Sequence, residues 1–182
     1  MNRICLIFAV ALMGLLVIIA QSYGSTSISQ NFDAMPAWSS SQDAGWGSAA
    51  VWSLAGSGQA GNALQASRSS AGSSSRVKVF DISPNKDYTI SVYIRCPSWS
   101  SSYWAECAYR AGSYSAQDFD ANAGAWSLIK KFSNSTANGN GNTWTKYALS
   151  FNSGASSQIS IGFKLGSSAS APTVAWDTLR IE

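Results

Sequence analysis

The chain has 182 residues and a formal net charge of +3, and only 12% of its residues are charged. It contains no histidine, which excludes Ser-His-Asp and Cys-His catalysis and every metal site that needs an imidazole ligand. The sequence has no cluster of lysine and arginine, so it predicts no nucleic-acid partner. The unusual feature is eight tryptophans in a chain that is rich in serine and glycine.

Residues 1–24 have the order of a secretory signal peptide. Arg3 precedes an uncharged apolar run over residues 4–20, and small residues follow, with Ser22 and Gly24 suitably placed for a cut after Gly24. Cleavage predicts a secreted or extracellular protein without stable membrane insertion. The alternative is a retained membrane anchor over residues 4–20, since a run of this length lies at the lower limit for a membrane span.

Residues 25–182 have the length of one domain and show no helical periodicity sustained over three turns. Alternating apolar and polar residues predict short strands instead, although segment 34–61 has weak strand character and is expected to form long surface loops. Such a series of strands is typical of a β-sandwich or barrel. The predicted strands are residues 62–68, 76–82, 86–96, 103–110, 126–132, 143–151, 157–166 and 173–182, with turns at 83–87, 138–142 and 152–156.

Two cysteines, Cys96 and Cys107, lie at the ends of a short segment. In a secreted protein such a pair is expected to be oxidised. If residues 86–96 and 103–110 form a hairpin, both cysteines point inward from facing positions, as a cross-strand disulfide requires. The alternative is two packed thiols, and a redox site is not favoured because the spacing is not that of a CxxC motif.

The segment between the cysteines carries several aromatic residues. Sugar rings present an apolar face of C–H groups, and an indole or phenol ring covers that face with a large, rigid surface. Outward polar side chains on the same strands would bind the hydroxyl groups. Trp144 and Trp176 are interpreted as core or sheet-edge residues. The predicted carbohydrate-binding set is Trp46, Trp52, Tyr93, Arg95, Trp99, Tyr103, Trp104, Glu106, Arg110 and Trp126.

Several segments in succession carry a family resemblance. They are "SISQNFDAMPAWS", "SGQAGNALQAS", "FDISPNKDYTISVYIR", "NTWTKYALSF" and "VAWDTLRIE". Their order resembles the jelly-roll carbohydrate-binding modules, which are galactose-binding-like β-sandwiches appended to polysaccharide-degrading enzymes. The resemblance covers nearly the whole segment 25–182. It implies an all-β, antiparallel jelly-roll sandwich that binds a polysaccharide or glycan without cleaving it, and a separate carbohydrate-active enzyme is a candidate partner.

An acid near the end of the chain suggests a metal site. Asp177 has the same strand parity as Leu179 and Ile181, so its carboxylate is expected among apolar side chains, where an unpaired charge is costly. In the resembling modules a structural Ca²⁺ is held by this aspartate, the acid of the first strand and backbone carbonyls. Asp33 and Asp177 match those two positions, and Ca²⁺ favours such oxygen ligands. The alternative is a set of hydrogen bonds from local backbone N–H groups.

Two other classes of function remain open. An enzyme would need paired carboxylates, and Asp118 and Asp120 are predicted on one strand face, with Glu106 as a candidate neighbour. The Glu-rich strand motif of jelly-roll glucanases is missing. A lyase would need a tyrosine together with histidine, asparagine or arginine, and the chain contains no histidine. Catalysis is therefore not expected. The other class is a surface-adhesion or protein-binding β-sandwich.

Overall fold

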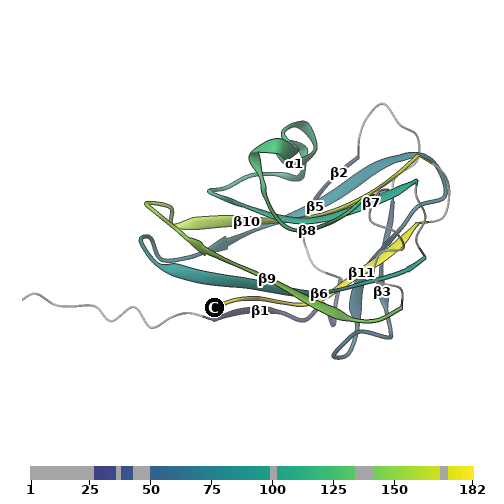
Figure 1. Cartoon of the computed structure of the whole chain (residues 1–182), viewed down its shortest axis with the longest axis horizontal. Coiled ribbons are helices and arrows are strands. Elements are labelled where there is room, and N and C mark those ends of the chain that lie inside the picture. Colours follow the sequence, from purple (N-terminus) through teal and green to yellow (C-terminus); the bar gives the residue numbers. More distant parts are fainter. Residues whose placement is uncertain (1–26, 36–37, 43–49, 99–101, 134–141, 169–171) are drawn as a thin grey trace, which may run out of the picture.

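The computed structural model describes residues 27–35, 38–42, 50–98, 102–133, 142–168 and 172–182. They form two antiparallel sheets stacked face to face, with a short helix on the outer side of one sheet (Figure 1). The predicted all-β sandwich is therefore confirmed. Within these described ranges, no helix is long and apolar enough to cross a membrane.

Sheet A is the layer that contains the last strand of the chain. Its strand order is β3-β4-β11-β6-β9, and β1 pairs with the other half of β11, so that Ile28 faces Ile181. Its strands are β1 (Ile28–Gln30), β3 (Val51–Ala55), β4 (Ala63–Ser67), β6 (Asp87–Ser98), β9 (Thr145–Asn152) and β11 (Thr173–Ile181).

Sheet B is the layer that carries the helix. Its strand order is β2-β5-β10-β7-β8, and α1 contacts β2 and β5 on its outer face (Figure 1). Its elements are β2 (Ser39–Gln42), β5 (Gly72–Asp81), β7 (Tyr103–Ala111), α1 (Ala116–Ala121), the 3₁₀ turn η1 (Ala123–Ala125), β8 (Ser127–Phe132) and β10 (Gln158–Ser167).

The segment predicted as surface loops contains two strands. β2 reads Ser-Ser-Ser-Gln and has no apolar alternation, but its register with β5 pairs Ser39 with Val77. β3 places Trp52 opposite Ala66 and Leu54 opposite Leu64. Both strands are short and lie at sheet edges, so ladder pairing rather than an internal sequence pattern defines them.

Four aromatic rings stack in series through the interior between the sheets. Phe163 lies 5.0 Å from the ring of Trp176 and 5.0 Å from the ring of Trp38, with interplanar angles of 13° and 20°. Trp176 in turn stacks on Trp52 at 5.6 Å. Each ring buries a large apolar area, so this series joins the two sheets. Trp176 is fully buried, as predicted.

The predicted hairpin between the two cysteine-bearing strands is wrong. β6 lies in sheet A and β7 lies in sheet B, so the strands that carry Cys96 and Cys107 do not pair. Both side chains point inward, but from opposite walls of the core, because strand parity fixes the face and not the sheet. Both are buried thiols and no disulfide joins them. Burial raises the pKa of the Cys107 thiol.

A second, smaller core lies under α1 on the outer face of sheet B. Phe119 packs over Gly162, where an added Cβ would come within 2.7 Å of the ring, and Trp126 lies 4.5 Å from Phe119. Trp126 is only 5% exposed, so the prediction that it presents its ring at the surface is wrong. The predicted strand face of Asp118 and Asp120 is also wrong, because both residues lie in α1. This helix is too short for a periodicity signal.

Candidate functional site

The predicted binding residues are divided between the two outer faces of the sandwich. Tyr93 and Arg95 lie on the outer face of sheet A, whereas Trp104, Glu106 and Arg110 alternate along the outer face of β7 in sheet B. The interior separates these groups, so they cannot form the single surface that the hairpin would have made. Trp46 and Trp99 lie outside the described residues.

The outer face of sheet B is organised along β10. Its outward residues are separated by about 6.7 Å, because successive residues of a strand alternate between faces. Each outward residue of β10 contacts a different group. Ser160 Oγ accepts the backbone N–H of Tyr114, Gly162 lies beneath Phe119, Lys164 pairs with Asp120, and Gly166 lies beneath Trp104.

Trp104 lies with one ring face against Gly166 of the neighbouring strand. A Cβ added to Gly166 would come within 1.9 Å of Cε2, 2.1 Å of Cζ2 and 2.3 Å of Nε1. Cε2 is shared by the two rings of the indole and carries no hydrogen. The added Cβ lies nearest to this atom, so Gly166 lies against the face of the indole ring and not against its edge. Trp104 is half-buried. We call this arrangement the Trp104 platform.

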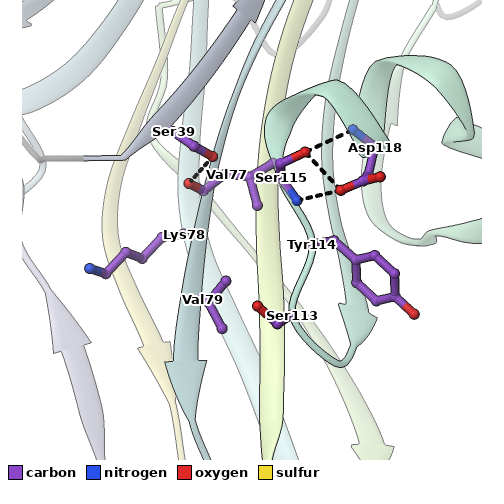
Figure 2. Close-up of a pocket in the computed structure, with 8 residues that line it drawn as sticks. All are labelled: Ser39, Val77, Lys78, Val79, Ser113, Tyr114, Ser115 and Asp118. Atoms are coloured by element: carbon purple, nitrogen blue, oxygen red, sulfur yellow. Dashed lines mark hydrogen bonds between the residues drawn. The ribbon is translucent and has the colours of Figure 1, made fainter.

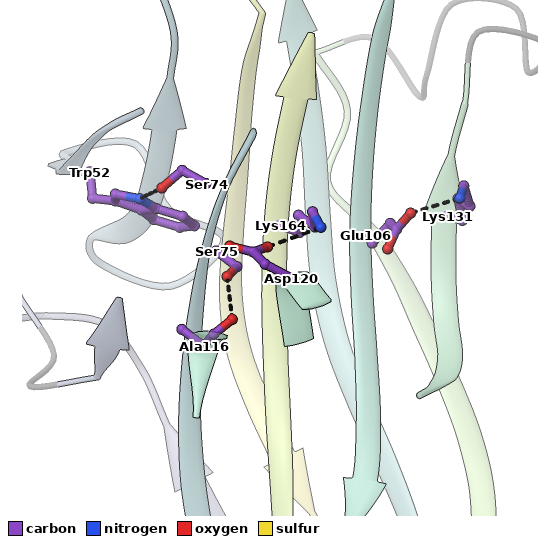
Figure 3. A network of polar contacts seen from close by, with 8 residues as sticks. All are labelled: Trp52, Ser74, Ser75, Glu106, Ala116, Asp120, Lys131 and Lys164. Atoms are coloured by element: carbon purple, nitrogen blue, oxygen red, sulfur yellow. Dashed lines mark hydrogen bonds and ion pairs between the residues drawn. The ribbon is translucent and has the colours of Figure 1, made fainter. Parts of the chain in front are cut away.

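Beside the platform lie four charged side chains that neutralise one another (Figure 3). Lys131 Nζ lies 2.7 Å from Glu106 Oε1, and Lys164 Nζ lies 2.9 Å from Asp120 Oδ1. Glu106 and Lys164 are cross-strand partners and are 6% and 8% exposed. Charges this deeply buried need partners. We call these four side chains the charged floor. Next to Trp104, the charged floor therefore offers charged hydrogen-bonding groups but no net charge.

Three other predicted residues take part in packing. Tyr103, at the start of β7, is buried. Trp52 stacks on Trp176 and donates from Nε1 to Ser74 Oγ at 3.0 Å (Figure 3), so its ring closes the edge of the interior. The guanidinium of Arg110 lies 3.8 Å from the centre of the Tyr114 ring.

A loop crosses the outer face of sheet A, and we call residues 56–62 the strap. At one end Arg95 Nη2 donates to Ser57 Oγ at 2.9 Å, and Trp144 Nε1 donates to Ser57 O at 3.3 Å. The Arg95 guanidinium also lies 4.8 Å from the centre of the Trp144 ring. Trp144 is half-buried, which agrees with its interpretation as a sheet-edge residue.

The other end of the strap is held by the two acids expected at the metal site. Ala60 N–H donates to Asp177 Oδ2 at 2.9 Å, and Asn62 N–H donates to Asp33 Oδ1 at 3.3 Å. Asp177 also accepts the N–H of Thr178 at 2.7 Å and is fully buried. Gly61 has φ +80°, and a Cβ there would lie within 2.4 Å of Asp33 Oδ1, so this close approach requires glycine.

Asp177 is buried for a different reason from the one predicted. Its register partner is Tyr93, whereas Arg180 pairs with Ser91, so β11 contains an extra residue between these pairs. Thr178 has φ +48° in this bulge. The bulge reverses the parity, which places Asp177 on the outer face beneath the strap and not among the apolar residues. The described residues contain no group of three or more His, Cys, Asp or Glu side chains suited to a metal.

Solved structures with a similar fold are known, although no similar sequence was found. No protein-family model and no curated protein matches the chain. A cleaved adhesin domain of Lys-gingipain from Porphyromonas gingivalis, K3, has a TM-score of 0.57 at 15% identity, covering 87% of this chain and 98% of that one. TmCBM61, solved with β-1,4-galactotriose, has a TM-score of 0.52 at 10% identity, with coverages of 84% and 93%.

A third similar structure is the enzymatically active domain of tailspike protein 4 from bacteriophage CBA120. Its TM-score is 0.55 at 13% identity, and the match covers 82% of this chain. This chain spans only 20% of the tailspike chain. At these identities the similarities establish the fold. The chain has a jelly-roll β-sandwich of the kind found in carbohydrate-binding modules and adhesin domains.

Proposed function

We propose that this chain is a non-catalytic carbohydrate-binding module that binds a neutral polysaccharide on the outer face of sheet B. The observation that carries the proposal is the Trp104 platform, in which one indole face rests on Gly166. A ring held in this way can stack on a sugar without losing further side-chain freedom. The similar fold of TmCBM61, solved with a galactotriose, supports the same class of ligand.

The charged floor favours a ligand without charge. Glu106 and Lys164 retain hydrogen-bonding capacity beyond their ion pairs, because a carboxylate accepts several hydrogen bonds and an ammonium group donates three. Their charges are balanced by Lys131 and Asp120. An acidic sugar would have to bring an uncompensated charge onto this neutral floor, whereas hydroxyl groups can accept from lysine and donate to glutamate.

The acids that a glycosidase would need have other partners. Asp118 Oδ2 accepts both the N–H and the hydroxyl of Ser115, and Asp120 pairs with Lys164. Two residues apart in a helix, the two acids are rotated by about 200° from each other. They do not face one substrate as an acid and base pair would. This arrangement supports binding without cleavage.

Affinity electrophoresis against neutral and acidic polysaccharides tests the proposal. We expect a neutral glycan to retard the wild type, Trp104→Ala to weaken binding about tenfold, and Trp144→Ala, the matched control on sheet A, to leave it unchanged. Failure of every glycan to retard the wild type would reject carbohydrate binding. Release of reducing ends would reject a non-catalytic role.

The second candidate function is surface adhesion through protein contacts, which the similar fold of the gingipain adhesin domain favours. The same experiment separates the two functions. An adhesin without a glycan ligand would show no retardation by any polysaccharide. A separate carbohydrate-active enzyme is proposed as a partner only for the carbohydrate-binding function.

We also propose a structural Ca²⁺ between Asp33 and Asp177. Among the described residues Asp177 has no cationic partner although it is fully buried, and a cation would compensate that charge. The two carboxylates would supply the oxygen ligands that Ca²⁺ prefers. Thermal unfolding with Ca²⁺ and with a chelator tests this. A rise in Tm that Asp177→Asn removes supports the site, and identical melting curves reject it.

Residues 1–24 lie outside the described residues, and we propose that they direct secretion. N-terminal sequencing of the protein from culture medium is expected to begin at Ser25. A product that stays with the membrane and retains residues 4–20 would instead establish the anchored alternative.

A further inference from the structure

The outer face of sheet A carries two cations side by side, next to the strap. Tyr93 of β6 pairs with Lys146 of β9, and Arg95 of β6 lies over the ring of Trp144, which precedes β9. Residues two apart on a strand lie about 6.7 Å apart on the same face, so these side chains leave the sheet as neighbours. We call Tyr93, Arg95 and Lys146, together with Ser57 of the strap, the cationic patch.

The two cations of the patch have no acidic partner. Within the described residues, no carboxylate pairs with Lys146 or Arg95. The acid nearest to them in the strand register is Asp177, on the other side of Tyr93. Asp177 is fully buried, and its carboxylate accepts two backbone N–H groups. The patch therefore carries two uncompensated positive charges, in contrast to the charged floor of sheet B.

Arg95 is fixed in place with only part of its donors in use. Nη2 donates to Ser57 Oγ at 2.9 Å, and the guanidinium lies 4.8 Å from the centre of the Trp144 ring. Nε is buried without a partner, whereas Nη1 is not buried and bonds to no described residue. A guanidinium has five N–H groups, so two on Nη1 and one on Nη2 remain for a ligand. Because this group has already lost part of its water, it attracts an anion more strongly than a fully hydrated cation does.

Two hydroxyl groups flank the cations. Tyr93 is half-buried and Ser57 is exposed. Ser57 Oγ accepts from Arg95, and its own O–H remains able to donate. An acidic sugar has a carboxylate and several hydroxyl groups, so it can use the cations and these hydroxyls together. A glutamate side chain of a peptide has only the carboxylate and would leave the hydroxyls unused.

The hollow beside α1 on sheet B does not fit an anion (Figure 2). Asp118 lines it, and Asp118 Oδ2 accepts the N–H and the hydroxyl of Ser115, each at 2.7 Å. These bonds lower the pKa of Asp118, so its carboxylate stays charged and repels another one. The Lys78 ammonium and the Tyr114 hydroxyl point away from each other (Figure 2), so they cannot hold one small ligand together.

We propose that the cationic patch binds a carboxylate-bearing sugar unit of an acidic polysaccharide, as a second site independent of the Trp104 platform. The carboxylate accepts from Arg95 and Lys146, and the sugar hydroxyls bond to Tyr93 and Ser57. The patch and the platform lie on opposite outer faces of the sandwich (Figure 1), so one sugar unit cannot contact both.

Titration of the ¹⁵N-labelled full chain with trigalacturonate, and with its neutral methyl ester, tests the proposal. We expect saturable amide shifts at residues 93–95 and 144–146 with the acid alone, and a Kd that rises with salt. Arg95→Gln with Lys146→Gln is expected to raise Kd about tenfold. Lys146→Gln alone changes an exposed side chain, so it leaves the packing intact, and it is expected to raise Kd about threefold.

The matched control is Lys78→Gln with Lys86→Gln, which removes the same charge elsewhere and is expected to leave Kd unchanged. An equal rise of Kd in this control would show non-specific attraction and overturn the site. Equal binding of the methyl ester, an unchanged Kd in the patch variants, or an absence of shifts would also overturn it. Triglutamate that binds as tightly as trigalacturonate would identify an acidic protein as the partner instead. Trp104→Ala is expected to leave this Kd unchanged, because loss of neutral-polysaccharide binding bears on sheet B alone.

Discussion

The outer face of each sheet carries a half-buried tryptophan, but the two tryptophans have different surroundings. On sheet A, the indole N–H of Trp144 is bonded to the strap and Arg95 lies over its ring. On sheet B, Trp104 rests on a glycine. Under the proposed function, Trp104 can serve as a platform because Gly166 supports its ring, whereas both the N–H and the ring of Trp144 already have partners.

The largest expected effect falls on the interior that both faces share. Phe163→Ala removes the ring between Trp38 and Trp176 and is expected to cost about 3–5 kcal/mol of unfolding free energy. Urea unfolding measures this loss. If the variant is nearly as stable as the wild type, the stacked rings do not couple the two sheets, and the faces can be treated as separate units.

Loss of the strap anchor is expected to affect sheet A alone. Asp177→Ala leaves the N–H groups of Ala60 and Thr178 without their acceptor and is expected to cost about 2–3 kcal/mol. Urea unfolding in chelator isolates this effect from any metal. Polysaccharide affinity of the folded variant is expected to be unchanged, and a loss of affinity would show that the two faces are coupled.

Displacement of the platform is expected to affect sheet B alone. Gly166→Val places side-chain atoms where the Trp104 ring lies and is expected to weaken polysaccharide binding about tenfold, or about 1.4 kcal/mol. Affinity electrophoresis measures the change. Gly154→Ala, at a turn in open space with φ +52°, provides a glycine control, and unchanged binding by Gly166→Val would remove Trp104 from the site.

The smallest effect is expected from the other tryptophan. Trp144→Ala removes the ring beneath Arg95 and one hydrogen bond to the strap, which predicts a loss of about 1 kcal/mol in stability. Thermal unfolding measures the loss, and affinity electrophoresis is expected to show no change. If polysaccharide binding falls as far as it does in Trp104→Ala, the difference between the two faces does not hold.

The sequence predicted the longer strands because their inward positions are consistently apolar. It could not assign Cys96 and Cys107 to different sheets, since parity gives a side and not a partner strand. The bulge at Thr178 reversed the parity of Asp177, and α1 was too short to show a period.

The candidate site was predicted only in part. Trp104 was predicted as an aromatic residue of the segment between the cysteines, and Glu106 from its outward position on the predicted strand. The neighbours of Glu106, Lys131 and Lys164, lie on other strands. One signal was available in "GFKLG", where Gly162 and Gly166 occupy outward positions four residues apart. Glycine inside a strand marks a close approach by another group, and here those groups are Phe119 and Trp104.

The pairing of β1 with β11 determines where this domain could be joined to another protein. Ile28 and Ile181 are cross-strand partners in sheet A, so any tether joined before the first strand or after the last would leave from nearly the same point. That point belongs to the layer opposite the Trp104 platform. If the proposed function holds, a carrier joined at either end would attach to sheet A and would leave the outer face of sheet B free for a ligand.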